Sequence, residues 1–244
     1  MKALILAAGY ATRLYPLTKE YPKSLLEVKG RPIIDYIVSG LQKVEAINEI
    51  FVVTNSKFFP FFDKWKSSLA AKKLITLVDD LTEDNATRRG AIGDIDFVVN
   101  AKSISEDLLV VGGDNLFDGS LNDFVDITSR HLPNVSMGIY DIRDIKEASR
   151  YGVVKLDNEK RIVDFKEKPE APESTLVAMC LYYFPKEKLG LMKEYKEAYH
   201  GKTDATGFYI DWLRKKEAVY GVAFGSKWYD IGDYKFYGLA QENF

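Results

Sequence analysis

A short segment after the first apolar run carries the groups that a phosphate-binding loop needs. Ala7-Ala8-Gly9-Tyr10-Ala11-Thr12-Arg13-Leu14 combines small side chains with a hydroxyl and a fixed positive charge. Small residues let backbone N–H groups approach an anion, and the planar guanidinium of Arg13 matches phosphate oxygens. Taken alone, the segment fits an ordinary strand-to-helix turn as well as it fits a phosphate loop.

Two familiar phosphate motifs fail on specific residues. A dinucleotide-binding fingerprint needs three glycines, and only Gly9 is present here. A P-loop needs glycine directly before its Lys-Ser pair, but Lys23-Ser24 follows Pro22. A dehydrogenase and a kinase or GTPase of the P-loop type are therefore disfavoured.

The elements around this segment read as a parallel α/β arrangement. Continuous apolar runs at 4–8, 50–53 and 108–111 are typical of strands buried on both faces, and residues 32–44 carry apolar side chains at helical spacing. The run at 73–78 predicts another strand, and the polar stretch 79–89 predicts a loop. Loops at the carboxyl ends of such strands commonly carry ligands.

The second half of the chain is richer in strand signals. Residues 135–140, 152–156, 162–165, 176–184 and 219–224 are strand-like, and the turn residues at 157–160 predict a hairpin. Helices are expected near 186–199 and 207–216. We therefore predict one mixed α/β domain over residues 1–244, with a first half at 1–126 and a β-rich second half at 127–244.

Composition limits the partners. The chain has 244 residues, 46% hydrophobic content and a formal charge of -2, which gives no bulk attraction to nucleic acid or an anionic membrane. The N-terminal apolar run is too short to span a membrane. The single cysteine, Cys180, lies in an apolar run, so a buried core thiol is expected. These features favour a cytoplasmic protein.

The first two dozen residues resemble a known family signature. The string from Leu6 to Thr18, followed by Pro22-Lys23-Ser24-Leu25-Leu26, is similar to L-x-G-G-x-G-T-R-L-x-P-x-T and K-x-L of the sugar-1-phosphate nucleotidyltransferases. Two positions depart from it, because Ala8 and Ala11 stand where many members have glycine, and Ala11 would resist a positive φ. The resemblance implies a single Rossmann-like (GT-A-like) nucleotidyltransferase domain with a mixed, mostly parallel sheet.

The resemblance also implies the nucleotide site. The residues expected to bind the nucleoside triphosphate are Leu6, Ala8, Gly9, Tyr10, Ala11, Thr12, Arg13, Asn85 and Gly90. Arg13, Lys23 and Asp114 are the expected catalytic residues. Segment 85–94 stands in the place of the family's base-reading loop, but Asn85 aligns less closely than Gly90.

Two carboxylates are expected to hold Mg²⁺. Asp114 follows the apolar run Leu109-Val110-Val111 in a G-D-N segment similar to the family's metal-binding strand end. Asp230 lies in Trp228-Tyr229-Asp230-Ile231-Gly232, which looks like the family's W-x-D-x-G segment, and Asp233 is a reserve. Magnesium at a triphosphate commonly takes one or two carboxylates together with phosphate oxygens and water.

Further motifs are similar to the family's sugar-phosphate site. Tyr151-Gly152-Val153 and Glu167-Lys168-Pro169 resemble its Y-G-V and E-K-P elements. A carboxylate such as Glu167 can accept hydrogen bonds from sugar hydroxyls while Lys168 meets the phosphate. Val177 or Ala178 is a weaker candidate for a backbone contact. His131 and His200 lie in no recognised element.

The implied reaction joins a nucleoside triphosphate to a sugar 1-phosphate and releases pyrophosphate. Glucose 1-phosphate with dTTP or UTP is the leading expectation, and guanylyl or cytidylyl transfer to another sugar or polyol phosphate remains open. A non-catalytic nucleotide-sugar-binding regulator is the alternative from another class. A glycosyltransferase is disfavoured, because this sequence lacks the D-x-D element that such an enzyme usually carries at the end of a strand. We expect no C-terminal β-helix domain, and a homo-oligomer is compatible with the sequence.

Overall fold

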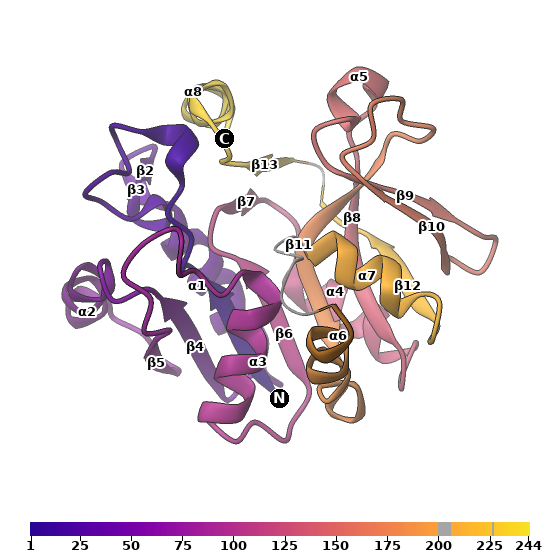
Figure 1. The fold of residues 1–244 in the computed structure, drawn as a ribbon. Coiled ribbons are helices and arrows are strands. Elements are labelled where there is room, and N and C mark those ends of the chain that lie inside the picture. Colours follow the sequence, from indigo (N-terminus) through magenta and orange to yellow (C-terminus); the bar gives the residue numbers. More distant parts are fainter. Residues whose placement is uncertain (200–205, 226) are drawn as a thin grey trace.

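The computed structural model describes residues 1–199, 206–225 and 227–244, and its first half is built on four parallel strands. They are β1 (Lys2–Leu6), β4 (Glu49–Thr54), β5 (Leu74–Asp79) and β6 (Leu108–Gly112), in the spatial order β6-β1-β4-β5. The central strands β1, β4 and β6 are buried on both faces, which explains their continuous apolar runs. Their carboxyl ends meet at one edge of the sheet (Figure 1).

The same sheet continues into the second half through antiparallel pairing. Residues 181–184 of β11 (Leu176–Phe184) pair with β6, and the other edge of β11 pairs with β8 (Val135–Asp141). The remaining strands are β9 (Gly152–Leu156), β10 (Ile162–Glu167) and β12 (Val219–Ala223). The β9 and β10 strands form the predicted hairpin, while β12 runs parallel to β8.

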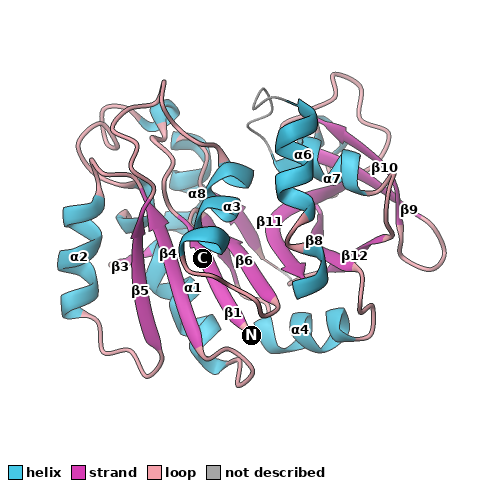
Figure 2. Cartoon of the chain, turned by 60° about the horizontal axis from the view of Figure 1, so that its bottom comes forward, coloured by secondary structure: helices cyan, strands magenta, loops and turns pink. Residues whose placement is uncertain are grey.

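Helices cover both faces of this sheet (Figure 2). On one face α1 (Ile33–Lys43), α2 (Phe59–Ser68) and α4 (Leu121–Ser129) contribute to one apolar core. On the other face α3 (Ala91–Ala101), α6 (Leu191–Tyr199) and α7 (Thr206–Leu213) contribute to a second core. The strand side chains alternate between the two cores, as the pleat of a sheet requires.

A third, smaller assembly lies at the carboxyl edge of the parallel strands. It contains the hairpin β2 (Glu27–Val28) and β3 (Arg31–Pro32), the ribbon β7 (Asn115–Phe117) and β13 (Trp228–Asp230), and α8 (Tyr234–Asn243). Leu14, Leu116 and Ile231 are fully buried among these elements. Short helical turns complete the chain: Thr12–Leu14, Lys23–Leu25, α5 (Ile145–Ala148) and Lys186–Lys188.

The predicted single α/β domain with a mixed sheet is confirmed, while several local boundaries differ. The first strand was expected at 4–8 but ends at Leu6, because the chain leaves the sheet there and the Leu6 carbonyl accepts from Gly113 N at 2.8 Å. The helix expected near 186–199 begins only at Leu191. Helix α3 was not predicted, because its apolar residues do not form a single stripe.

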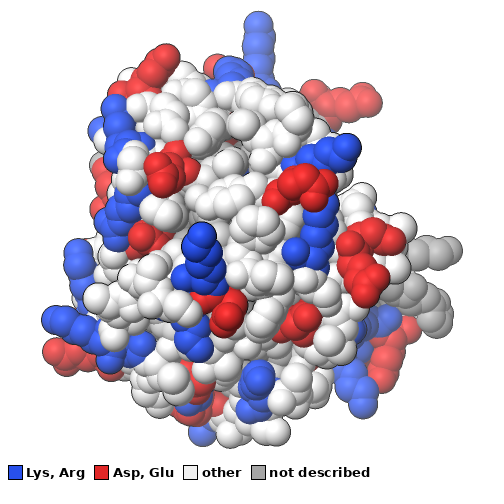
Figure 3. Space-filling model, turned by 90° about the vertical axis from the view of Figure 1, so that its left-hand side faces the viewer, with Lys and Arg blue, Asp and Glu red and all other residues white. Residues whose placement is uncertain are grey.

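The surface shows no single dominant charge on the face formed by α2 and β5. Basic and acidic side chains are interspersed there, with uncharged areas between them (Figure 3). This distribution agrees with the small net charge of -2. Among the described residues, no helix has the length and apolarity to cross a membrane.

Candidate functional site

The loop after β1 is held by bonds from two neighbouring segments. Asn55, which follows β4, is buried and donates from Nδ2 to the Ala8 carbonyl at 2.8 Å. The fully buried Thr18 donates from Oγ1 to the Ala11 carbonyl at 2.8 Å. Ala11 adopts φ 47° and ψ 44°, so the left-handed conformation that its side chain was expected to resist is present. These bonds compensate for the strain at Ala11 and fix the loop that ends in Arg13.

The loop after β6 approaches this first segment closely. A β-carbon at Gly113 would lie 2.6 Å from Ser24 Oγ and 2.7 Å from the Leu6 carbonyl oxygen, so only glycine fits there. The close approach brings Asp114, the next residue, beside Lys23. The distance between Lys23 Nζ and Asp114 Oδ2 is 2.6 Å. Two sequence-predicted residues that are 91 positions apart therefore meet in an ion pair.

Each member of this pair favours the charged form of the other. Burial alone would lower the pKa of Lys23, but the carboxylates of Asp114 and Asp230 hold that pKa above its ordinary value. Burial acts to raise the pKa of Asp114, and the opposing attraction of Lys23 holds it below its ordinary value. In the ligand-free chain Lys23 thus neutralises Asp114.

The β7–β13 ribbon brings Asp230 to the same place. Asp230 is paired with Asn115 in the antiparallel register, one residue from Asp114, and Ile231 N donates to the Asp114 carbonyl at 3.0 Å. Burial, reinforced by the charge of Asp114, raises the pKa of Asp230 to about 6. Asn115 supports the arrangement, because it donates to Asp114 Oδ1 at 3.1 Å while its Oδ1 accepts from Trp228 Nε1 at 2.6 Å.

The two carboxylates form a donor set that fits Mg²⁺ at a triphosphate. The charge of Asp114 raises the pKa of Asp230, so a bound cation would relieve this repulsion, and hard carboxylate oxygens are the ligands that Mg²⁺ prefers. Within the part of the chain that the structure describes, no group of three or more His, Cys, Asp or Glu residues is placed to hold a metal. The remaining ligands would then come from phosphate oxygens and water.

A cavity of about 380 Å³ extends from this acid pair into the second half of the chain. Its lining residues are Arg13, Ala91, Asp114, Asn115, Arg150, Tyr151, Gly152, Phe165, Glu167, Lys168, Ala178, Cys180, Tyr182, Thr206, Gly207, Trp228 and Asp230. One end of the cavity thus has Arg13 with Asp114 and Asp230, and the other end has Lys168 with Glu167. Lys168 Nζ lies 3.7 Å from Glu167 Oε1, and burial raises the pKa of Glu167 while Lys168 opposes the shift.

Nine predicted binding residues are not among those that line this cavity: Leu6, Ala8, Gly9, Tyr10, Ala11, Thr12, Asn85, Gly90 and Val177. Val177 is fully buried in the core on the opposite side of β11, and its neighbour Ala178 lines the cavity instead. Asn85 lies on an exposed loop, where its carbonyl accepts from Arg88 Nη1 at 2.9 Å. Tyr10 is buried, and its hydroxyl lies 3.3 Å from Thr82 Oγ1.

The start of α3 borders the same cavity that Arg13 and Asp114 line. Gly90 caps this helix with φ 74°, and the next residue, Ala91, lines the cavity. Beneath this turn lie two buried acids, Asp80 and Asp94, which are hydrogen-bonded to each other. Burial raises the pKa of the Asp80 carboxyl.

The expectation that Cys180 is a core thiol was wrong. The pairing of β11 with β8 is irregular between Ala178 and Tyr182, and Cys180 lies in this stretch and lines the cavity. Sequence reasoning also missed Arg150, Tyr182 and Gly207, because their approach depends on how distant strands and helices pack. Arg150 is ion-paired with Asp233, which caps α8. His200 lies outside the described residues.

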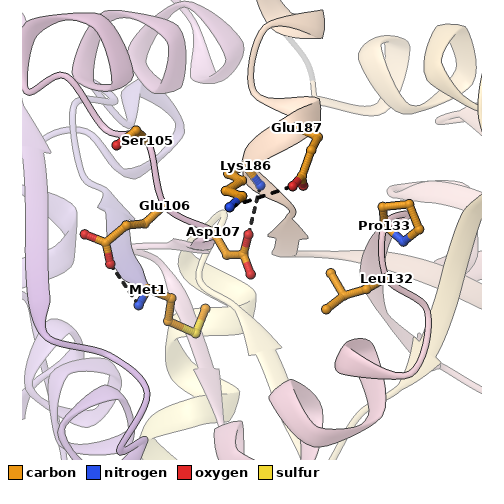
Figure 4. A pocket seen from close by; sticks show the side chains of 8 residues that line it. All are labelled: Met1, Ser105, Glu106, Asp107, Leu132, Pro133, Lys186 and Glu187. Atoms are coloured by element: carbon orange, nitrogen blue, oxygen red, sulfur yellow. Dashed lines mark hydrogen bonds and ion pairs between the residues drawn. The ribbon is translucent and has the colours of Figure 1, made fainter.

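A second hollow, of about 460 Å³, lies at the opposite edge of the sheet (Figure 4). Its residues precede β1, β6 and β8 or follow β11. Its charged groups are paired locally: the amino group of Met1 lies 3.1 Å from Glu106, and Asp107 accepts from Lys186 N at 2.9 Å. This hollow contains none of the predicted site residues.

Comparisons with known proteins show the family of the chain. A family model described as nucleotidyl transferase matches residues 2–243. The bifunctional protein GlmU of Methanocaldococcus jannaschii is 30% identical over 232 residues, which are 95% of this chain and 51% of that protein. A Sulfolobus acidocaldarius protein provisionally named a mannose-1-phosphate guanyltransferase is 30% identical over 189 residues, 78% of this chain and 50% of that protein.

The chain thus spans about half the length of these curated relatives. Among solved structures, that of UDP-glucose pyrophosphorylase complexed with UDP-glucose is similar with a TM-score of 0.81 and 22% identity. The similarity covers 99% of this chain and 97% of that one, which shows a shared fold.

Proposed function

Because the chain belongs to the nucleotidyl transferase family, we propose that it transfers a nucleotidyl group from a nucleoside triphosphate to a sugar 1-phosphate. One observation carries the proposal: a single cavity is lined by Arg13, Asp114 and Asp230 at one end and by Glu167 and Lys168 at the other. The products are a nucleoside-diphosphate sugar and pyrophosphate.

In the proposed reaction, a phosphate oxygen of the sugar 1-phosphate attacks the α-phosphorus of the triphosphate. The bond between that phosphorus and the bridging oxygen to the β-phosphate breaks, and the electron pair leaves with pyrophosphate. No protein nucleophile takes part, so catalysis rests on positioning two polyanions and neutralising their charge.

Arg13 and Lys23 act on the triphosphate. Arg13 stands at the end of the loop fixed by Asn55 and Thr18, where its fork of N–H donors can meet phosphate oxygens. Lys23, whose Nζ contacts Asp114, would neutralise charge on the α-phosphate. The same lysine then compensates the charge that develops during transfer.

Asp114 and Asp230 are the residues that would hold Mg²⁺. A bound cation would polarise the α-phosphate and would weaken the electrostatic repulsion between it and the incoming sugar phosphate. Asn115 and Trp228 keep Asp114 oriented through the chain of hydrogen bonds described above. Fixed carboxylates of this kind lose little entropy when a cation binds.

The second half of the cavity receives the sugar 1-phosphate. Lys168 follows β10 in a left-handed conformation, φ 44°, and its backbone N–H donates to the Tyr151 carbonyl at 3.0 Å. This bond fixes the base of the lysine, while its side chain remains more than half exposed. Lys168 and Arg150 supply positive charge for the phosphate, and Glu167 accepts from sugar hydroxyls.

For the substrates themselves, we propose glucose 1-phosphate with dTTP or UTP, which rests on the sequence resemblance. Guanosine and cytidine triphosphates belong in the same test, because one relative of 30% identity carries a guanyltransferase name. Asn85 lies on an exposed loop and Tyr10 is buried, so base selectivity is measured across the panel of triphosphates.

Pyrophosphate release tests the proposal directly. Purified protein with Mg²⁺ is assayed with ATP, GTP, CTP, UTP and dTTP against glucose, mannose, galactose and N-acetylglucosamine 1-phosphates. We expect release that requires both substrates, with the nucleotide sugar identified by mass spectrometry. If no pair gives release while nucleotide sugars still bind, the chain is a binding regulator.

A further inference from the structure

The Glu167 carboxylate occupies space that exists only because residue 207 is glycine. Gly207 is the second residue of α7 and is buried beside β10, with which α7 packs. A β-carbon at Gly207 would overlap Glu167 Oε2 and would lie 2.6 Å and 2.9 Å from two ring atoms of Phe165. Such distances are too short for any side chain to be accommodated without movement.

A second glycine closes the same space from the other side. A β-carbon at Gly152, on β9, would overlap Phe165 Cζ and lie 3.2 Å from Glu167 Oε2. Two backbones that are 55 positions apart in the sequence therefore enclose one ring and one carboxylate. The ring of Phe165 is rigid, so the flexible Glu167 side chain is the part that would move if the space were filled.

We propose that Gly207 is a positioning residue for the sugar end of the cavity, which holds the Glu167 carboxylate where it accepts hydrogen bonds from hydroxyls of the sugar 1-phosphate. The inference rests on the proposed function. Gly207 itself makes no contact with substrate: its missing side chain determines where Glu167 lies. The ligand class is a sugar phosphate with free ring hydroxyls.

The main test is Gly207→Ala. We expect the KM for the sugar 1-phosphate to rise about tenfold or more, since a hydrogen bond to a charged group is lost, while the KM for the triphosphate stays within about twofold. The Gly207→Ala variant should also discriminate less between the sugar 1-phosphate and its deoxy analogue than the wild type does. Gly190→Ala is the matched control, because a β-carbon at Gly190 meets nothing within 4 Å.

A second background protects the test against misfolding. Phe165→Leu removes the ring atoms that a β-carbon at Gly207 would strike, so Phe165→Leu/Gly207→Ala retains only the overlap with Glu167. Compared with Phe165→Leu alone, the double variant should show the same rise in KM for the sugar phosphate. Thermal unfolding and binding of the triphosphate, measured in both, report whether each variant is folded.

A double-mutant cycle separates positioning from general disruption. In a Glu167→Ala background, adding Gly207→Ala should change the KM for the sugar phosphate by less than about twofold, because the group that Gly207 positions is already absent. Additive effects in the cycle, or an unchanged KM in folded Gly207→Ala protein, would overturn the inference. A wild-type chain without activity toward any substrate pair would instead defeat the proposed function.

Discussion

The two ends of the cavity are built in different ways. At the triphosphate end, charged side chains meet each other: Lys23 is paired with Asp114, and Asp230 lies beside them. At the sugar end, shape decides the arrangement, because Gly152 and Gly207 leave the space in which Phe165 and Glu167 lie. Substitutions at the first end should therefore change chemistry and charge balance, whereas those at the second should change substrate binding.

Asp114→Asn tests the charged end most severely. The variant loses one of two metal-holding carboxylates and the partner of Lys23, so we expect kcat for pyrophosphate release to fall by at least about 10³-fold. The assay is run at saturating substrates. Asp126→Asn, on the exposed side of α4, is the control and should retain full activity.

Lys23→Met separates the two roles of this lysine. We expect a loss of activity of about 10²-fold, because a cation on the triphosphate is missing. In the absence of nucleotide, however, affinity for Mn²⁺ measured by electron paramagnetic resonance should rise, since Asp114 no longer has an internal partner. Lys19→Met, exposed on the same loop, should change neither quantity.

Lys168→Met tests the end determined by shape. Since the Lys168 side chain is more than half exposed and solvent weakens its interactions, we expect only about a tenfold rise in the KM for the sugar 1-phosphate. Initial rates at varied sugar phosphate give this value, and the KM for the triphosphate serves as internal control. Equal rises in both constants would contradict the division of the cavity into two ends.

Asp230→Asn should stabilise the ligand-free chain. Burial and Asp114 raise the pKa of Asp230 to about 6, so the folded state binds this proton more tightly than the unfolded state. Stability from this residue is therefore lost as the pH rises from about 4 to about 6. Urea unfolding should show the variant more stable than wild type by about 1–3 kcal/mol at pH 7, with no difference below about pH 4.

Ala11→Gly is the smallest expected effect. Relief of the left-handed strain at Ala11 is partly offset by the greater freedom of glycine in the unfolded chain, so we expect a gain of less than about 1 kcal/mol. Ala8→Gly is the matched comparison, because Ala8 has no positive φ and is buried. The free energy of unfolding of Ala8→Gly should be lower than that of wild type by about 0.5–1 kcal/mol in urea unfolding. A gain for both variants would contradict this account.

The charged end could be predicted from the sequence better than the end determined by shape. Asp114 follows the apolar run of β6, so its place at a sheet edge follows from the strand pattern, whereas Arg13 and Lys23 were assigned through the family resemblance. Gly207 and Arg150 carry no such signal, because their roles arise only when α7 and β9 pack against β10. Cys180 was misjudged because an irregularity in strand pairing is invisible in an apolar run.

The elements of the fold also differ in how well the sequence predicts them. Strands β1, β4 and β6 were predicted because burial on both faces leaves continuous apolar sequence. Helix α3 was missed because Gly90, with its positive φ, starts it without the usual side-chain cap, and its apolar residues are not confined to one side. The strands could thus be predicted from local sequence, whereas helix α3 depends on how it packs in the folded chain.

The β7–β13 ribbon has a consequence for how the molecule is made. It brings Asp114 and Asp230 together by pairing Asn115 with Asp230, although the two acids are far apart in the chain. A ribosome that has delivered the four parallel strands has not yet delivered the second acid. The emerging chain therefore lacks the complete proposed cation site until residue 230 has been translated, and the proposed activity cannot precede that point.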